Sequence, residues 1–341
     1  MSLNAEFLSL AQLFKNKLLN TKELCDKFDD TIPSKEKQLI FIEKLGKEIF
    51  PNWDDHFLKI WDIYENFDKN SQKLHQKYYQ QELVPLFYGS PYNRRVYEKP
   101  LGYAGDYIMM LYLYENGLEG KTTFDKLVHR YSMLVPTARA NHNRKNFYKK
   151  HIIDVLEKKK NPKITSVASG PTKEIIEILQ ENQLAINANF YCVDFEKEAL
   201  DYVKDEVSAI EKEKGKKYHL QYINSDILGF VRGKNIGSLV FDQDLIYSSG
   251  LIDYFSDRIA AKFIRFFLKL LGKNGKLIVG NVATGDKHRA YTEILGEWYL
   301  HRRDQECMLR LIENIKSNYR VEIAFEEETK MNVFLIIQRN D

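Results

Sequence analysis

The residues with the clearest chemical meaning are a tight turn and an acid that follows it. An apolar stretch, 164–167, leads into the small residues Ala168, Ser169 and Gly170, and a helix-forming run follows at once. Small residues at such a turn let the backbone approach a ligand closely, with helix N–H groups directed at it. Asp194 ends the next apolar stretch, where a carboxylate can accept hydrogen bonds from a ribose diol. The pattern indicates a cofactor that contains adenosine.

The same turn lacks the glycines of a dinucleotide site. Three glycines there let a pyrophosphate rest directly on the backbone, whereas the corresponding positions of this chain hold Ala168, Gly170 and Thr172. S-adenosylmethionine (SAM) has no phosphate and needs only close approach by its adenosine and amino-acid parts. The turn therefore favours SAM, and an NAD-dependent oxidoreductase with a degenerate turn is the alternative.

The elements that position these residues alternate between strand and helix from residue 162 onward. Such alternation predicts a mostly parallel sheet covered on both faces, with a hairpin-like pair of strands at the end. Strands are predicted at 164–168, 189–193, 219–223, 237–242, 276–281, 320–324 and 332–337, and helices near 172–182, 196–211, 256–272 and 287–316.

The region before the sheet is predicted to be helical, because apolar residues recur there at helical spacing. Breaks are predicted at 29–33 and at 51–55, where Asp54 or Asp55 would cap the next helix. A Gly- and Tyr-rich ordered loop covers 88–108. Helices follow at 108–113 and 137–156. We expect a helical region at 1–87, a loop-and-helix region at 88–155 that caps the active site, and a SAM-binding α/β domain at 156–341.

Three segments carry a family resemblance. The block 166–282 resembles a class I SAM-dependent methyltransferase domain. The motif Lys-Pro-Leu-Gly-Tyr-Ala-Gly-Asp-Tyr at 99–107, with 244–254 and Glu-Trp-Tyr-Leu at 297–300, is similar to the bacterial group linked to 3-hydroxypalmitic acid methyl ester biosynthesis. The resemblance covers 85–341. One departure is Ala-Ser-Gly-Pro-Thr at 168–172, where the family carries more glycine.

The resemblance implies an α/β fold, namely the Rossmann-like class I methyltransferase fold: a mostly parallel seven-stranded sheet with a C-terminal antiparallel hairpin and a helical N-terminal extension. It also implies a set of cofactor contacts. The methionine part would lie along the turn, the ribose on the acid, and the adenine and sulfonium near further residues: Ala168, Ser169, Gly170, Asp194, Phe195, Asp226, Ile227, Asp244 and Tyr247. Purely structural roles for Gly170, Asp194, Asp226 and Asp244 stay open.

Two further residues are candidates for cofactor binding. Arg144 lies on the helix before the first strand, and a guanidinium there can pair with the carboxylate of SAM; a solvated helical arginine is the alternative. Tyr103 lies in the 99–107 loop with Asp106, and the two could close over the site as a lid. A structural loop is the alternative.

Methyl transfer from a sulfonium is an in-line displacement, so the enzyme must position the acceptor and exclude water. A carboxylate acceptor needs no base, whereas a hydroxyl or amine acceptor must lose a proton. Tyr247, His301 and Asp253 are the catalytic candidates, with Tyr254 and Glu297 as further bases. Arg302 or Arg303, beside His301, could hold an acidic substrate, and a surface histidine is the alternative for His301.

The composition limits the classes of partner that this protein is expected to bind. The 51 basic and 48 acidic residues give a net charge of only +3. This small excess does not indicate a nucleic-acid-binding protein, which is usually strongly basic. The three cysteines lie far apart and fit a reducing cytosol, and no apolar run approaches a membrane span. No metal is expected. A small-molecule or lipid-like acceptor follows, and the resemblance implies the carboxylate of a 3-hydroxy fatty acid. A non-catalytic SAM-binding scaffold is the second alternative, and the oligomeric state stays open.

Overall fold

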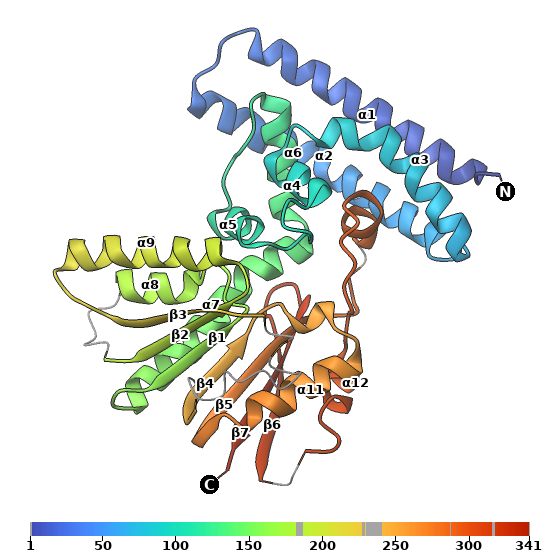
Figure 1. Cartoon of the computed structure of the whole chain (residues 1–341). Coiled ribbons are helices and arrows are strands. Elements are labelled where there is room, and N and C mark those ends of the chain that lie inside the picture. The colour runs from blue at the N-terminus through green and yellow to red at the C-terminus, as the bar shows by residue number, and fades with distance from the viewer. Residues whose placement is uncertain are drawn as a thin grey trace. The chain divides into compact units, whose positions relative to one another are not determined.

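A computed structural model describes residues 2–181, 187–226, 229, 241–286, 288–315 and 318–340 (Figure 1). The chain forms two compact units. The helical unit comprises Met1–Arg139 and Asp286–Tyr299, and the sheet unit comprises Ala140–Gly285 and Leu300–Asp341.

The helical unit is built from long amphipathic helices, as predicted. Their starts are set by side chains that accept backbone N–H bonds: Asn4, Ser34 and Asp68 cap the first three helices. The helices are α1 (Ala5–Asp29), α2 (Lys35–Tyr64), α3 (Lys69–Phe87), α4 (Pro91–Glu98), α5 (Tyr107–Glu115) and α6 (Thr123–Leu134), with a π-helix at Ala290–Leu295. The sequence did not predict α6, and it did not predict α4, which lies within the segment 88–108 that was predicted to be an ordered loop.

The break predicted at 51–55 is wrong, because α2 continues through Pro51. Proline removes one intrahelical hydrogen bond and normally kinks or ends a helix. Here Trp53 and Phe57 are buried in an aromatic cluster around Tyr131, and this packing holds the turn in place. Asp54 caps no helix and instead accepts a hydrogen bond from the Tyr131 hydroxyl at 2.8 Å.

The sheet unit contains seven strands in the order β3-β2-β1-β4-β5-β7-β6. The pairs from β3 to β5 are parallel, and β7 runs antiparallel to both β5 and β6. The predicted Rossmann-like class I methyltransferase fold, with its C-terminal hairpin and helical N-terminal region, is confirmed. The strands are β1 (Lys163–Val167), β2 (Asn189–Asp194), β3 (His219–Asn224), β4 (Gln243–Ser248), β5 (Leu271–Val282), β6 (Tyr319–Phe325) and β7 (Asn332–Arg339).

Helices cover both faces of this sheet, as the strand–helix alternation predicts. One core holds Tyr148, Ile175 and Val203, so α7, α8 and α9 cover that face. The other core holds Phe263 and Met308, which places α11 and α12 on the opposite face (Figure 1). The helix bounds are α7 (Pro136–Lys158), α8 (Lys173–Glu181), α9 (Lys197–Lys214), α11 (Asp257–Leu268) and α12 (Gln305–Arg310).

The strand predicted at 237–242 is misplaced: β4 begins at Gln243, and Asp242 has a left-handed φ of 58°. Residues 237–240 lie outside the described residues. The prediction took strands to be runs of apolar residues, and it therefore missed the start of β4, which is polar. Gln243 is fully buried, and its amide oxygen accepts a hydrogen bond from the Thr165 hydroxyl at 2.6 Å, while the Asp244 carboxylate accepts one from the Lys163 backbone N–H at 2.9 Å.

The single helix predicted at 287–316 is also wrong. The described part of this segment contains the π-helix, then Glu297 in left-handed conformation with φ 50°, and the separate short helix α12. The residue in left-handed conformation ends the first piece, because an L-residue with positive φ cannot continue a right-handed helix. Apolar spacing alone did not register this interruption.

Candidate functional site

The turn after β1 has three alternate residues in left-handed conformation. The φ angles are 50° at Ala168, 52° at Gly170 and 46° at Thr172. Glycine adopts this conformation freely, whereas an L side chain costs about 1–2 kcal/mol. The chain therefore keeps a glycine-type turn although only one of the three positions is glycine. Backbone strain of this kind is concentrated at functional sites.

Asp194, at the end of β2, is tied to this turn. Its carboxylate accepts the Gly170 backbone N–H at 2.8 Å and the Glu196 backbone N–H at 2.9 Å. Burial raises the pKa of the Asp194 carboxyl, and the backbone N–H bonds act against that rise. A carboxylate oxygen can accept more than one hydrogen bond, so both oxygens retain capacity for hydroxyl donors.

Two buried hydroxyls stand at the carboxyl edge of the central strands. Ser169 follows β1 and Ser248 ends β4, and β1 and β4 are neighbours in the sheet. Neither Oγ atom has a hydrogen-bond partner within the described part of the chain. In open α/β sheets, ligands bind outside the carboxyl ends of the strands at the point where the strand order reverses, which here lies between β1 and β4. Both hydroxyls are thus open to a hydrogen bond from water or from a ligand at this edge.

Arg144 reaches this edge from α7. Its Nη1 atom donates to the Ser249 carbonyl oxygen at 3.0 Å, and the side chain is buried. A Cβ atom built on Gly250 would lie 2.8 Å from the same Nη1, so the guanidinium packs directly against the Gly250 backbone. The structure therefore brings Arg144 to the residues that follow β4.

Asp253 lies just beyond, in the short 3-10 helix Ile252–Tyr254. Its Oδ1 atom accepts the backbone N–H of Val282, the last residue of β5, at 2.6 Å. Burial raises the pKa of Asp253 to about 6, while the Val282 N–H bond and the charges of nearby arginines act against the rise. The Asp253 carbonyl oxygen accepts the backbone N–H of His301 at 2.7 Å, and the His301 side chain is exposed.

Arg303 holds this segment in place. It is almost fully buried, and all five of its N–H donors have partners. The partners are the carbonyls of Ile252 and Phe255, the amide oxygen of Asn281 and the carboxylate of Asp257. Arg303 is thus a structural clamp with no donor left for an acidic substrate. The sequence carries no signal for such a role, because a buried arginine in a loop resembles an exposed one.

Several predicted site residues lie elsewhere. Asp244 is at the amino-terminal start of β4, where it pairs with Lys159 at 3.0 Å. Tyr247 is buried under the sheet and donates to Glu174 Oε1 at 2.6 Å; burial raises the pKa of both groups. Asp244 thus lies at the opposite end of β4 from the carboxyl edge, whereas Tyr247 directly precedes Ser248 and its role near the sulfonium stays a prediction.

The adenine-side residues are spread along that edge. Phe195 follows β2 and Asp226 follows β3, and both side chains are exposed. Ile227 lies outside the described residues. Tyr103 belongs to the helical unit, in the loop that Asp106 anchors: Asp106 caps α5 and binds Arg95 through both oxygens at 2.8 Å. The role of Tyr103 over the cofactor stays a prediction.

Solved structures share the fold. A structure described as a possible exported protein from Bordetella parapertussis is 13% identical, over 87% of this chain and 97% of its own, with a TM-score of 0.54. At this identity the similarity shows the fold alone. Magnesium protoporphyrin IX methyltransferase (ChlM) from Synechocystis PCC 6803 with bound SAM matches over 60% of this chain and 83% of its own, at 9% identity and a TM-score of 0.42.

A third similar structure is the N-methyltransferase NodS from Bradyrhizobium japonicum WM9 in complex with S-adenosyl-L-homocysteine, with 12% identity over 57% of this chain and 86% of its own and a TM-score of 0.38. No protein-family model and no curated protein matches the chain. No helix in the described ranges is long and apolar enough to cross a membrane.

Proposed function

We propose that this chain is a SAM-dependent methyltransferase. The observation that carries the proposal is the bond between Asp194 and the left-handed turn at Gly170, at the carboxyl edge of a sheet whose order reverses between β1 and β4. This edge offers an acceptor for a ribose diol beside a turn without side-chain bulk.

The residues present fit SAM better than a dinucleotide. Asp194 would accept hydrogen bonds from the ribose hydroxyls, and Ser169 and Ser248 would gain partners from the amino-acid portion. Arg144 is held close to the residues after β4, where its guanidinium would pair with the carboxylate of the methionine part. A pyrophosphate fits poorly, because the Asp194 carboxylate already takes the Gly170 N–H and places a negative charge on the turn.

SAM, when bound, supplies a methyl group that passes to the acceptor by in-line displacement. The chain's own contribution is to orient the reactants and exclude water. Asp253 can accept a proton from a hydroxyl acceptor, because its carboxyl lies at the same edge and its pKa of about 6 makes it a base near neutral pH. Arg303 fixes the segment that carries Asp253.

The acceptor is a small or lipid-like molecule. The resemblance of the 99–107 and 244–254 segments supports the carboxylate of a 3-hydroxy fatty acid, which would give a methyl ester. The scattered cysteines support a cytosolic enzyme. Asp253 favours an alternative acceptor, a hydroxyl group of the substrate. A hydroxyl must lose a proton during transfer, whereas a carboxylate acceptor needs no base.

Transfer of the labelled methyl group of SAM tests the proposal. The purified chain is incubated with labelled SAM and either 3-hydroxypalmitate or its methyl ester, in which the carboxyl is already blocked. Label on the acid alone identifies the carboxylate as acceptor, and Asp253→Asn should then retain activity. Label on the ester identifies the hydroxyl, and Asp253→Asn should then lose activity. SAM binding without any transfer across an acceptor panel would instead favour the scaffold alternative, and NAD turnover the oxidoreductase.

A further inference from the structure

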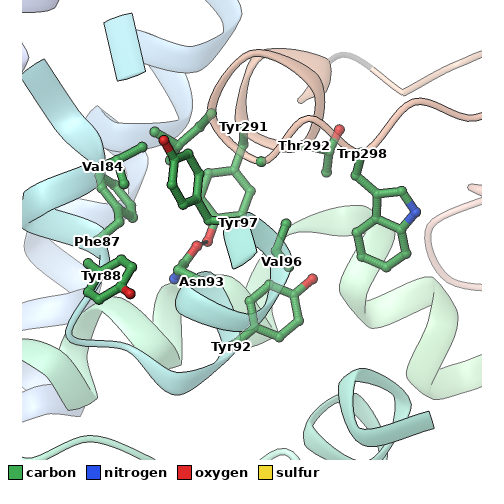
Figure 2. Close-up of a pocket in the computed structure, with 12 residues that line it drawn as sticks. Val84, Phe87, Tyr88, Tyr92, Asn93, Val96, Tyr97, Tyr291, Thr292 and Trp298 are labelled. Carbon is green, nitrogen blue, oxygen red and sulfur yellow. Dashed lines mark hydrogen bonds between the residues drawn. The ribbon is translucent and has the colours of Figure 1, made fainter. Parts of the chain in front are cut away.

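A hollow between α2 and α6 has room for a small molecule. Its free volume is about 260 Å³. The hollow between α3, α4 and the π-helix segment, shown in Figure 2, is nearly filled by its own side chains, because its free volume of about 20 Å³ holds only about one water molecule. We call the larger one the α2–α6 pocket.

The walls of the α2–α6 pocket come from one face of α2 and the end of α6. The lining residues on α2 recur three or four positions apart, so they share a face of that helix. Every residue of the lining belongs to the helical unit. The pocket combines the apolar surface of Phe50, Pro51 and Leu134 with charged groups.

Asp54 contributes a carboxylate to this pocket. Tyr131, a buried residue of α6, donates its hydroxyl to Asp54 Oδ1 at 2.8 Å, and His288 Nε2 lies 3.5 Å from the same oxygen. The Tyr131 bond therefore orients the carboxylate. Within the described ranges, Asp54 Oδ2 has no partner. Because an ionised carboxylate is only an acceptor, Oδ2 is open to a donor from outside the chain.

Pro51 leaves a second acceptor near this carboxylate. Proline has no N–H, so the Lys47 carbonyl oxygen lacks the intrahelical donor that residue 51 would otherwise supply. Side chains of a helix lean toward its N-terminus, so Asp54 extends back over the turn that contains Phe50 and Pro51. The carboxylate and this carbonyl therefore lie at the same turn of α2.

Two aromatic rings line the pocket beside these acceptors. The ring centroids of Phe50 and Tyr131 lie 5.2 Å apart, and Phe50 is half-buried. A Cβ built on Gly46 would lie 2.6 Å from Phe50 Cε2, so the Phe50 ring packs directly against the Gly46 backbone. The face of an aromatic ring attracts cations. The rings and the oxygen acceptors thus favour the same kind of group, an ammonium.

The chain's own cations near the pocket are directed elsewhere. Arg130 donates from Nε to Glu43 at 2.9 Å and from Nη1 to Asn116 at 3.0 Å. Lys47 lies two turns before Asp54, and its side chain leans away from Asp54 toward the turn of Glu43. Among the residues that the structure describes, no lysine or arginine forms an ion pair with Asp54. Its negative charge is therefore open to an external cation.

From these observations we infer that the α2–α6 pocket binds a small organic ammonium ion that carries an apolar group. The ammonium would lie against Asp54, the Lys47 carbonyl oxygen and the Phe50 ring. The apolar group would lie against Pro51 and Leu134. The inference concerns the helical unit alone and does not rest on the methyl transfer proposed for the sheet unit.

Calorimetry of the full-length chain with benzylamine, which is protonated at neutral pH, tests this inference. Benzyl alcohol and benzoate present the same ring with a neutral and an anionic head group. We expect benzylammonium to bind about three- to tenfold more tightly than benzyl alcohol, and benzoate to bind more weakly than either, because only the cation gains from the carboxylate and the ring faces. Equal binding of the three probes, or no binding of benzylammonium at millimolar concentration, would overturn the inference.

The variant Asp54→Asn keeps an oxygen for the Tyr131 hydroxyl but removes the charge. It should weaken benzylammonium binding by about three- to tenfold and leave benzyl alcohol binding unchanged. The matched control is Asp55→Asn, since Asp55 is the next residue of α2, pairs with the exposed Lys59 and does not line the pocket. Equal effects of the two variants on benzylammonium binding would also overturn the inference.

A second pair of variants tests the carbonyl acceptor. Pro51→Ala supplies an N–H to the Lys47 carbonyl oxygen, so the preference for benzylammonium over benzyl alcohol should fall by about two- to fivefold. Pro85→Ala makes the same change within α3, outside the pocket lining, and should leave the preference as it is. The same preference in both variants would contradict the assignment of this carbonyl to the site.

Discussion

The carboxylate of Asp194 accepts the backbone N–H of Gly170 at 2.8 Å, and this bond joins the end of β2 to the turn that follows β1. It fixes the acid beside a backbone segment that carries no side chain at its closest point. The two features that the sequence singled out are therefore one structural unit.

The turn stores strain that glycine would relieve. Ala168 has a φ of 50°, so we expect Ala168→Gly to raise the free energy of unfolding by about 0.5–1 kcal/mol. The control is Ala261→Gly in α11, which should lower it by about 1 kcal/mol, because glycine is unfavourable within a helix. Urea unfolding of both variants measures the difference. A loss of stability in both would show that the Ala168 conformation is not strained.

The buried hydroxyl of Ser248 has no partner in the described chain, so its removal should cost the free protein nothing. We expect Ser248→Ala to leave the free energy of unfolding unchanged or slightly higher, and to weaken binding of S-adenosylhomocysteine by about five- to tenfold. Ser208→Ala, at an exposed position of α9, should change neither quantity by much. Unchanged ligand affinity in Ser248→Ala would remove this hydroxyl from the site.

Asp253 should make stability depend on pH. Burial raises the pKa of Asp253 from 3.8 to about 6. Between these values the folded chain holds a proton that the unfolded chain releases, so the free energy of unfolding falls as pH rises through this window. The loss amounts to about 3 kcal/mol at neutral pH.

Asp253→Asn should abolish this part of the pH dependence, because the amide keeps an oxygen for the Val282 N–H but does not ionise. Urea unfolding at several pH values between about 4 and 7 measures the effect. Asp205→Asn, at an exposed position of α9, is the control and should follow the unchanged protein. Parallel curves for all three proteins would contradict a raised pKa at Asp253.

The clamp of Arg303 should be sensitive even to a conservative change. Lysine has three donors and cannot replace the planar fork that serves the two carbonyls, Asn281 and Asp257. We expect Arg303→Lys to lower the free energy of unfolding by about 3 kcal/mol, whereas Arg310→Lys, at an exposed side chain of α12, should change it by less than about 0.5 kcal/mol. A small effect at Arg303 would mean that the segment carrying Asp253 holds itself in place.

The sequence predicted the sheet well where local signals and burial agree. The buried strands β1 and β2 and the turn at Gly170 were correctly placed, since each is bounded by a clear break. The prediction from sequence was wrong where contacts between distant residues determine the bounds of a helix or strand. Burial of Trp53 carries α2 through Pro51, and Thr165 satisfies the polar start of β4 at Gln243.

The candidate site shows the same division. Asp194 and the turn were visible because their types and spacing are local. The resemblance also assigned Asp244 and Tyr247 to the sulfonium, but the structure places Asp244 at the amino-terminal start of β4 and Tyr247 against the buried Glu174. The sequence does not show which residues pack on each face of a buried strand, so it does not show which groups a side chain of that strand will contact. The division of the chain at residues 87 and 155 stays a prediction.

The central claim is that the carboxyl edge at Asp194 binds SAM. Titration calorimetry with S-adenosylhomocysteine tests it directly, on the unchanged chain, on Asp194→Ala and on the exposed control Asp205→Ala. We predict measurable binding to the unchanged chain and to the control, and a loss of about 1–3 kcal/mol, or roughly five- to 150-fold in affinity, for Asp194→Ala. Absence of binding to the unchanged chain at millimolar ligand, or equal affinity in all three proteins, would contradict the claim.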